Sequence, residues 1–163
     1  MQKITTSGLD IAKTTFHAMH RNSVGKNIKK KKLTRKKVLD YFANMAPHLI
    51  GIESCSAAHY WARELEKQGH TVRLIPPQFV KPYVLGNKND FNDASAIAEA
   101  VTRPEMRFVQ IKTTGQHDTQ SLMRIRKRAE KDRTAHSNMV RGLLAEYGIS
   151  ISKGIHKFYE ELP

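Results

Sequence analysis

The feature of this sequence that most constrains its fold is an alternation of short apolar runs with a helix-like segment. Residues 48–53 (HLIGIE) and 71–75 (TVRLI) have the length and composition of buried strands. Between them, Trp61 and Leu65 fit a helix of about four turns, with possible caps in residues 54–56. A strand, a helix and a strand in this order favour a sheet with a parallel part, so the sequence predicts the α/β class with a mixed sheet flanked by helices.

An opening hairpin and an alanine-rich helix are expected on either side of this region. Residues 3–9 and 14–20 are typical of two short strands. A basic segment follows them, and Thr34 is placed to cap a helix after it. Beyond the second apolar run, Asn89 and the aspartate after it cap a helix that ends before Pro104.

The last third of the chain has a different pattern. Residues 119–147 contain no proline and only one glycine, and apolar side chains recur there at spacings of three, four and seven. The pattern predicts one long amphipathic helix of the coiled-coil type, which usually packs on another helix, so we expect at least a homodimer. The predicted organisation is a domain of residues 1–113, a helical arm of residues 114–148 and a tail of residues 149–163.

The charge balance favours a polyanionic partner. The 28 Lys and Arg residues exceed the 15 Asp and Glu residues and give a formal net charge of +13. No apolar run approaches the ~18 residues of a membrane span, and no signal peptide is visible, so we expect a soluble, cytoplasmic protein with no membrane partner. The single cysteine, Cys55, excludes an internal disulfide and a CxxC zinc site.

Two groups of basic residues are candidates for contact with nucleic acid. One lies between residues 26 and 37, and the other lies on the predicted long helix. Lysine runs are often only solvated surface, but their density in so basic a chain favours contact with phosphates. Aromatic residues are few and not interleaved with the second group, which argues against a base-stacking platform. The candidates are Lys29, Lys30, Lys31, Lys32, Lys36, Lys37, Lys88, Arg124, Arg128 and Lys131.

Four carboxylates stand where a catalytic site could form. Asp10 and Glu53 end two strands, and Asp90 and Asp93 share one face of a helix's first turn. Because the ends of neighbouring strands converge on a crevice in an α/β sheet, the four side chains can meet. Such a cluster needs a cation, and its hard oxygen ligands suit Mg²⁺ or Mn²⁺ in phosphoryl transfer. Singly, each aspartate is also an ordinary cap or turn residue.

The histidines and serines add no second candidate site. The eight histidines show no ligand spacing such as HExxH. His17 and His20 fall on opposite faces of a strand and are interpreted as structural or surface residues. Ser54, Ser56 and Ser95 are interpreted as caps or solvent-facing residues.

Four stretches of the sequence carry a resemblance to a known family. They are GLDIAK at residues 8–13, GIES at residues 51–54 with Trp61 beyond it, PPQFVK at residues 76–81 and KNDFNDASAIAEA at residues 88–100. Their order and spacing resemble the DEDD transposases, the insertion-sequence recombinases related to the Piv invertase. The resemblance covers nearly the whole chain and implies an N-terminal domain like the Holliday-junction resolvase RuvC, with a ribonuclease-H-like fold. It also implies the metal-binding set Asp10, Glu53, Asp90 and Asp93.

The resemblance implies further parts of the enzyme. In the family, a C-terminal domain supplies a serine that attacks DNA, and the long helix forms a coiled-coil contact between subunits. Some members use a structured guide RNA, the bridge RNA, to choose their DNA. No segment here corresponds to the serine domain, so the tail of residues 149–163 is expected to lead toward it, and no serine of this chain is assigned as the nucleophile.

The leading interpretation is therefore the N-terminal catalytic domain of a DNA transposase or site-specific recombinase, incomplete without its C-terminal domain. Two alternatives stay open at this point. One is a stand-alone, structure-specific nuclease of the Holliday-junction type. The other is a truncated, non-catalytic module that dimerises and binds DNA or RNA. Continuation of the reading frame beyond Pro163 would favour the transposase.

Overall fold

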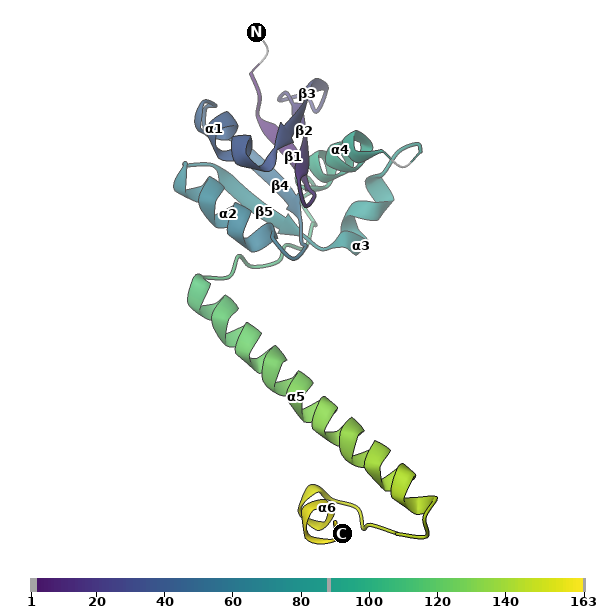
Figure 1. Ribbon diagram of the computed structural model, residues 1–163. Coiled ribbons are helices and arrows are strands. Elements are labelled where there is room, and N and C mark those ends of the chain that lie inside the picture. Colours follow the sequence, from purple (N-terminus) through teal and green to yellow (C-terminus); the bar gives the residue numbers. More distant parts are fainter. Residues whose placement is uncertain (1–2, 88, 163) are drawn as a thin grey trace. The chain divides into compact units, whose positions relative to one another are not determined.

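The computed structural model describes residues 3–87 and 89–162, and the chain divides into two compact units. The first unit ends at Lys112 and the second begins at Thr113, one residue before the predicted boundary. The first unit contains a sheet with helices on both faces, and the second contains a long helix and a short one (Figure 1).

The sheet of the first unit is mixed. Within the described residues it has five strands in the order β3-β2-β1-β4-β5. Strands β1 (Thr6–Ile11), β2 (Thr15–Arg21) and β3 (Asn27–Thr34) are antiparallel neighbours. Strands β4 (Leu49–Glu53) and β5 (Thr71–Ile75) extend the sheet in parallel from β1. This mixed sheet with flanking helices, together with the long C-terminal helix, confirms the predicted fold class.

One face of the sheet carries the larger hydrophobic core. Helices α1 (Val38–Ala43) and α2 (Ala58–Lys67) cover this face (Figure 1). Removal of this apolar surface from water is the main favourable contribution to folding. The buried members include Leu9, Phe16, Ala18, Ile50, Ile52 and Leu74 from the strands and Phe42, Trp61 and Leu65 from the helices.

The opposite face is covered by α4 (Asp90–Ala100), which approaches the sheet closely at two glycines. A Cβ atom on Gly8 would lie 2.0 Å from the carbonyl oxygen of Ala94. A Cβ atom on Gly51 would lie 2.8 Å from the Cβ atom of Val101. Both positions therefore require glycine for α4 to lie where it does, and this contact fixes the height of the helix above β1 and β4.

One ion pair attaches the second half of α4 to β2. Helix α3 (Pro77–Val80) and the 3-10 turn η2 (Lys81–Tyr83) precede α4 and pack beside it. Glu99 of α4 accepts hydrogen bonds from Arg21 of β2 and from Arg103, and the bond from Arg21 is the main cause that lowers the pKa of Glu99. The pair with Arg21 joins α4 to β2, whereas the pair with Arg103 is local (i, i+4) and orients the Glu99 carboxylate.

The sequence does not predict strand β3. Residues 27–34 were expected to be only a basic segment before a helix, but they pair with β2 as the edge strand. Leu33 is the one buried residue of β3, so the strand lacks the alternating apolar pattern of a half-buried strand. Thr34 makes no side-chain capping bond, and the 3-10 turn η1 (Arg35–Lys37) leads from it into α1.

The predicted serine caps of α2 are also not used, whereas the cap of α4 is. Helix α2 has Ala57 as its N-cap, without a side-chain hydrogen bond, and is ten residues long, shorter than expected. The backbone N–H of Ala58 instead donates to the carbonyl of Cys55, so a backbone turn replaces the side-chain cap. The side chain of Asn89 accepts from the backbone N–H of Phe91, as the sequence predicts.

A buried polar network lies on the α1 side of the sheet. The Ser7 hydroxyl lies 2.7 Å from Nδ1 of His20 and 2.8 Å from Nε2 of His48. The Tyr41 hydroxyl lies 3.0 Å from Nε2 of His20. Burial, with the neighbouring His48, lowers the pKa of His20 to about 4, so this ring is neutral near pH 7. His20 is therefore a structural residue, in agreement with its interpretation from the sequence.

In the second unit, α5 (Thr114–Ala145) begins before residue 119, where the predicted apolar repeat begins. It ends before residue 147, where that repeat was predicted to end. A capping box between Thr113 and Gln116 starts the helix. At the other end, Gly148 adopts a φ of +78°, and its N–H donates to the carbonyl of Ala145. This left-handed residue ends the helix before Tyr147, which was expected to lie within it.

The tail of the second unit contains a short helix that the sequence did not predict. Helix α6 (Ile155–Glu160) buries Phe158, and the guanidinium of Arg141 on α5 lies 5.1 Å from the centre of that ring. Nearer the start of α5, Leu122 is 68% exposed and Ile125 is 66% exposed. Because these apolar side chains are uncovered in the single chain, contact with a second copy stays a prediction. Among the described residues, no helix is both long and apolar enough to cross a membrane.

Candidate active site

Asp10 and Glu53 lie beside each other near the ends of two parallel strands. The register of β1 and β4 pairs Leu9 with Ile52, so the next residue of each strand is a neighbour of the other. Both acids lie two residues beyond the glycines that contact α4, and side chains alternate along a strand. Asp10 and Glu53 therefore share the face of the sheet that α4 covers.

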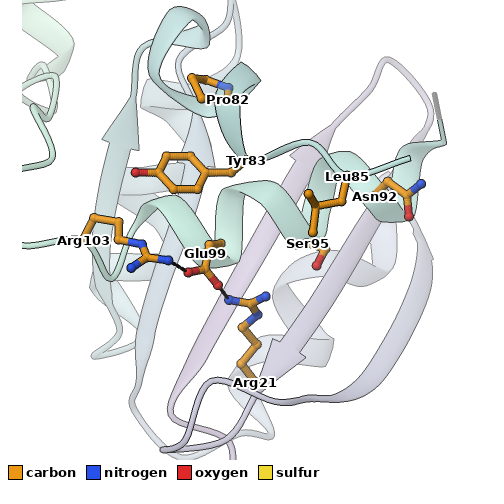
Figure 2. Close-up of a pocket in the computed structure, with 8 residues that line it drawn as sticks. All are labelled: Arg21, Pro82, Tyr83, Leu85, Asn92, Ser95, Glu99 and Arg103. Carbon is orange, nitrogen blue, oxygen red and sulfur yellow. Dashed lines mark hydrogen bonds and ion pairs between the residues drawn. The ribbon is translucent and has the colours of Figure 1, made fainter. Parts of the chain in front are cut away.

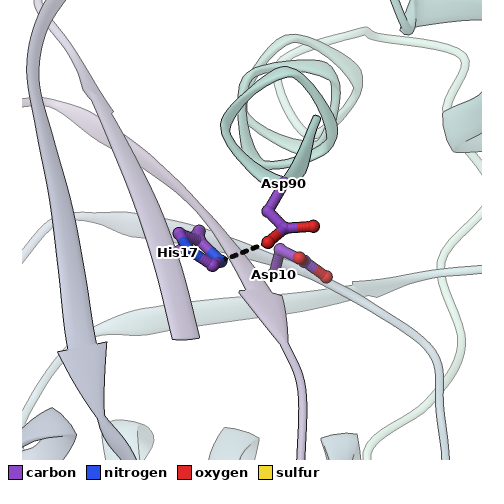
Figure 3. A group of neighbouring side chains, drawn as sticks. All are labelled: Asp10, His17 and Asp90. Carbon is purple, nitrogen blue, oxygen red and sulfur yellow. Dashed lines mark ion pairs between the residues drawn. The ribbon is translucent and has the colours of Figure 1, made fainter. Parts of the chain in front are cut away.

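The first turn of α4 brings a third carboxylate to this place. Asp10, His17 and Asp90 each offer one ligand atom, and these atoms all lie within 4.8 Å of one another (Figure 3). His17 Nδ1 lies 3.4 Å from Oδ2 of Asp90. The Asp90 side chain is 65% exposed, whereas that of His17 is 8% exposed, so the cluster has a buried side and a side open to solvent.

Asp93 and Glu53 are coupled to this cluster by their charges, although they are not members of the close group of three. Burial, followed by the charges of Asp93 and Asp90, raises the pKa of Asp10 to about 6. Burial and then Asp93 also raise the pKa of Glu53, while Lys81 opposes this shift. The four acids predicted from the sequence therefore influence one another across β1, β4 and α4.

This donor set fits a divalent cation. Burial and then the repulsion between neighbouring carboxylates raise the pKa values of Asp10 and Glu53, so the ionised forms are unfavourable there without a cation. A bound cation favours the ionised carboxylates and so lowers their pKa values. Carboxylate oxygens are the protein ligands that Mg²⁺ and Mn²⁺ prefer. The residues present therefore suit either ion.

The sequence pattern did not reveal the position of His17. This residue pairs directly with Asp10 in the β1–β2 register, and its ring packs edge-on against Phe91 with the ring centroids 4.8 Å apart. Directly opposite residues on antiparallel strands share a face. The sequence predicts the hairpin that contains both residues, but it does not give the register between the two strands. Without that register, His17 could not be placed opposite Asp10.

The four lysines of β3 divide between the two faces of the sheet. Lys32 pairs with His17, and Lys30 lies two residues away with its Nζ 5.4 Å from the centre of the Phe91 ring. These two lysines are therefore on the face of the acids. Lys29 lies on the other face, where its Nζ is 5.6 Å from the centre of the Tyr41 ring. Lys31 shares that second face because side chains alternate along the strand.

The other basic candidates lie in η1, in the second unit or outside the described residues. Lys36 and Lys37 are exposed in η1. Lys88 lies outside the described residues. Arg124, Arg128 and Lys131 are exposed on α5, where Arg128 pairs with Asp132 at 2.9 Å. No geometry links these three residues to the acids, so their contact with nucleic acid stays a prediction.

A separate hollow lies along the outer side of α4. It has a volume of about 400 Å³ and contains the ion pairs of Glu99 described above (Figure 2). None of the four acids lines it, so it is distinct from the acidic cluster. Its lining residues are Arg21, Pro82, Tyr83, Leu85, Asn92, Ser95, Glu99 and Arg103.

Comparison with known proteins identifies similar sequences. A family model described as "Transposase", for the DEDD transposases of the IS110 type, matches residues 7–149. The chain is 50% identical over 144 residues to a "Probable family 20 transposase" of Pseudomonas aeruginosa, covering 87% of this chain and 42% of that protein. It is 45% identical over 163 residues to the "Transposase for insertion sequence element IS1111A" of Coxiella burnetii, covering 100% of this chain and 45% of that protein.

The chain thus spans less than half the length of these curated relatives. Among solved structures, "T. thermophilus RuvC in complex with Holliday junction substrate" matches with a TM-score of 0.46 and 13% identity, covering 60% of this chain and 91% of that chain. This likeness is distant, and the relationship to transposases does not depend on it.

Proposed function

Because this chain belongs to the DEDD transposase family, we propose that its first unit performs metal-dependent phosphoryl transfer on DNA during transposition of an insertion sequence. The observation that carries the proposal is the meeting of Asp10 and Asp90, from a strand and a helix far apart in the sequence. Glu53 and Asp93 complete the proposed set, because their charges act on the Asp10 carboxyl. No competing arrangement of acids across separate elements has comparable support among the described residues.

In this proposal the carboxylates hold one or two Mg²⁺ or Mn²⁺ ions. When bound, such an ion polarises a phosphoryl oxygen and favours the ionised form of an attacking oxygen. Asp10 is suited to the central position because it is flanked by Glu53 on β4 and Asp90 on α4. The exposed side of Asp90 leaves the cluster open toward solvent, where a phosphodiester could approach.

We further propose that DNA lies across the face of the sheet that bears the acids. Lys30 and Lys32 share this face and are exposed, so they are suited to contact phosphates on either side of the reacting bond. Lys29 and Lys31 have the same charge and lie on the same strand but face α1. The strand thus provides its own matched control.

The double substitution Lys30→Ala and Lys32→Ala should weaken DNA binding and reduce its salt dependence. Each lost phosphate contact lowers the magnitude of the negative slope of log K against log salt concentration by about 0.9, so loss of both should lower that magnitude by roughly 2. All four lysines are exposed on an edge strand, so we expect both double variants to fold. Fluorescence anisotropy of labelled duplex DNA over a salt series measures the slope.

Lys29→Ala with Lys31→Ala is the control, because it removes an equal charge from the same strand. We expect this control to change the slope by less than half as much, through general electrostatics alone. An equal loss for the two pairs would reject a face-specific contact. A larger loss for Lys29 and Lys31 would place DNA on the α1 face and contradict the proposal.

A further inference from the structure

We propose that His17 is a nitrogen ligand of the metal site and biases it toward Mn²⁺ over Mg²⁺. This inference rests on the proposed function, because it adds a residue to the same acidic cluster. His17 stands outside the set D…E…DxxD that the sequence motif provides. It comes from β2, an element that contributes none of the four acids.

The first argument is the state of the His17 side chain. The residue is 6% exposed, and its Nδ1 makes no hydrogen bond to the described part of the chain. A buried polar atom without a partner is unfavourable, and such atoms are rare in folded proteins. The carboxylate nearest to Nδ1 is that of Asp90, whose Oδ2 lies 3.4 Å away. The atom therefore faces the carboxylates and is available for a ligand placed among them.

The second argument is the spacing of the donor atoms. Ligands at about 2.1 Å from one ion lie about 3 Å apart when adjacent and about 4 Å apart when opposite. The donor atoms of Asp10, His17 and Asp90 all lie within 4.8 Å of one another, which is close to these separations (Figure 3). The exposed Asp90 side chain has room to adjust. The ring of His17 is fixed, because it packs edge-on against Phe91.

The third argument concerns the choice of metal. An imidazole nitrogen is a softer donor than a carboxylate oxygen. Mg²⁺ prefers oxygen ligands and retains its water, whereas Mn²⁺ binds more tightly than Mg²⁺ to mixed nitrogen and oxygen sites. A site of carboxylates alone discriminates little between these ions. Coordination by His17 therefore predicts a preference for Mn²⁺ that depends on this residue.

The competing role for His17 is to hold Asp90 by donating a hydrogen bond from Nδ1. In that case Nδ1 carries a proton and cannot coordinate a metal. The two roles differ in a direct observable, which is magnetic coupling between bound Mn²⁺ and a histidine nitrogen. Pulsed electron paramagnetic resonance detects this coupling in the unaltered protein, so the test does not require a variant to fold.

The experiment uses the 163-residue chain loaded with Mn²⁺. We expect ¹⁴N modulation that changes to the ¹⁵N pattern when histidine is labelled, and that disappears in His17→Phe, which keeps a ring but removes the donor. Titration should show Mn²⁺ affinity falling about tenfold or more in His17→Phe, with a smaller fall for Mg²⁺. A thermal melt of His17→Phe checks that this variant is folded.

Three results would overturn the inference, and they are distinguishable. Mn²⁺ binding that is lost in Asp10→Asn but shows no nitrogen coupling in the unaltered protein would leave the acidic site standing and reject His17 as a ligand. Absence of any Mn²⁺ binding would reject the proposed function and this inference together. Coupling that persists unchanged in His17→Phe would assign the nitrogen to another histidine and also reject the inference.

Discussion

Replacing Asp10 with asparagine should stabilise the metal-free protein at neutral pH while removing its response to divalent cations. Burial, with Asp93 and Asp90, raises the pKa of Asp10 from 3.8 to about 6. The ionised carboxyl is therefore less favourable in the folded chain than in the unfolded chain. Because the side chain is partly exposed, solvent reduces the effect, and we expect a gain of about 1–2 kcal/mol in the free energy of unfolding for Asp10→Asn.

The pH dependence of this gain has a definite sign. The folded state binds the Asp10 proton more tightly than the unfolded state, so the destabilisation is fully present above about pH 6. It decreases as the pH falls through this range and disappears below the unfolded value of 3.8. The gain in Asp10→Asn should follow the same course. Denaturant unfolding at pH 7.5, about 5 and about 3.5 measures it.

Added metal should reverse the order of stability of the two proteins. At a concentration one hundred times its Kd, an ion that binds only the folded state adds about 2.7 kcal/mol. This gain is expected for the unaltered chain and not for Asp10→Asn. Asp40→Asn is the control, because Asp40 is an exposed acid on α1, away from the cluster. A metal response that survives in Asp10→Asn would show that the ion binds elsewhere.

Gly8→Ala should destabilise the protein more than Gly51→Ala or Gly142→Ala. Its Cβ would lie 2.0 Å from the Ala94 carbonyl oxygen and 2.4 Å from the backbone nitrogen of Ala98. Both are backbone atoms, so α4 itself must move. Overpacking changes cost about 1–3 kcal/mol when side chains can adjust, and we expect about 3 kcal/mol or more here. Metal affinity should also fall, because α4 carries Asp90 and Asp93.

A series of glycine substitutions provides the controls. Gly51→Ala should cost less than Gly8→Ala, because its closest contact, at 2.8 Å, is the side-chain Cβ of Val101. Gly142→Ala should stabilise α5 by about 0.5–1 kcal/mol, because nothing lies within 4 Å of its added Cβ. Urea unfolding measures all three changes. A Gly8→Ala variant as stable as the unaltered chain would show that α4 does not pack this closely.

The parts of the fold that were predictable from the sequence are those with strong local signals. β5 lies at residues 71–75, as predicted, because an apolar run stops there at a pair of prolines. β3 was not predictable, because an edge strand with lysines on both faces lacks the alternation that marks a strand. The length of α5 was visible in its spacing, but its end depends on the left-handed conformation of Gly148.

The candidate site shows the same division between local and tertiary information. The sequence places Asp10 and Glu53 near strand ends and Asp90 on a helix. The approach of Asp10 to Glu53 depends on the register of β1 and β4, and the approach of Asp90 depends on the contact of Gly8 with α4. No local pattern marks a glycine for that purpose. The sequence alone favours a structural or surface role for His17, because the residue opposite it, Asp10, is on another strand. Register and helix height are tertiary properties, and they decide which side chains meet.

The most direct test of the account is the position of Mn²⁺ in crystals of the chain soaked in that ion. Anomalous scattering locates manganese without any assumption about its ligands. The account predicts a peak beside Asp10, between the end of β4 and the first turn of α4, within coordination distance of carboxylate oxygens from Asp10 and Asp90. A fully loaded crystal with no peak there, or with Asp10 and Glu53 on opposite faces of the sheet, would contradict it.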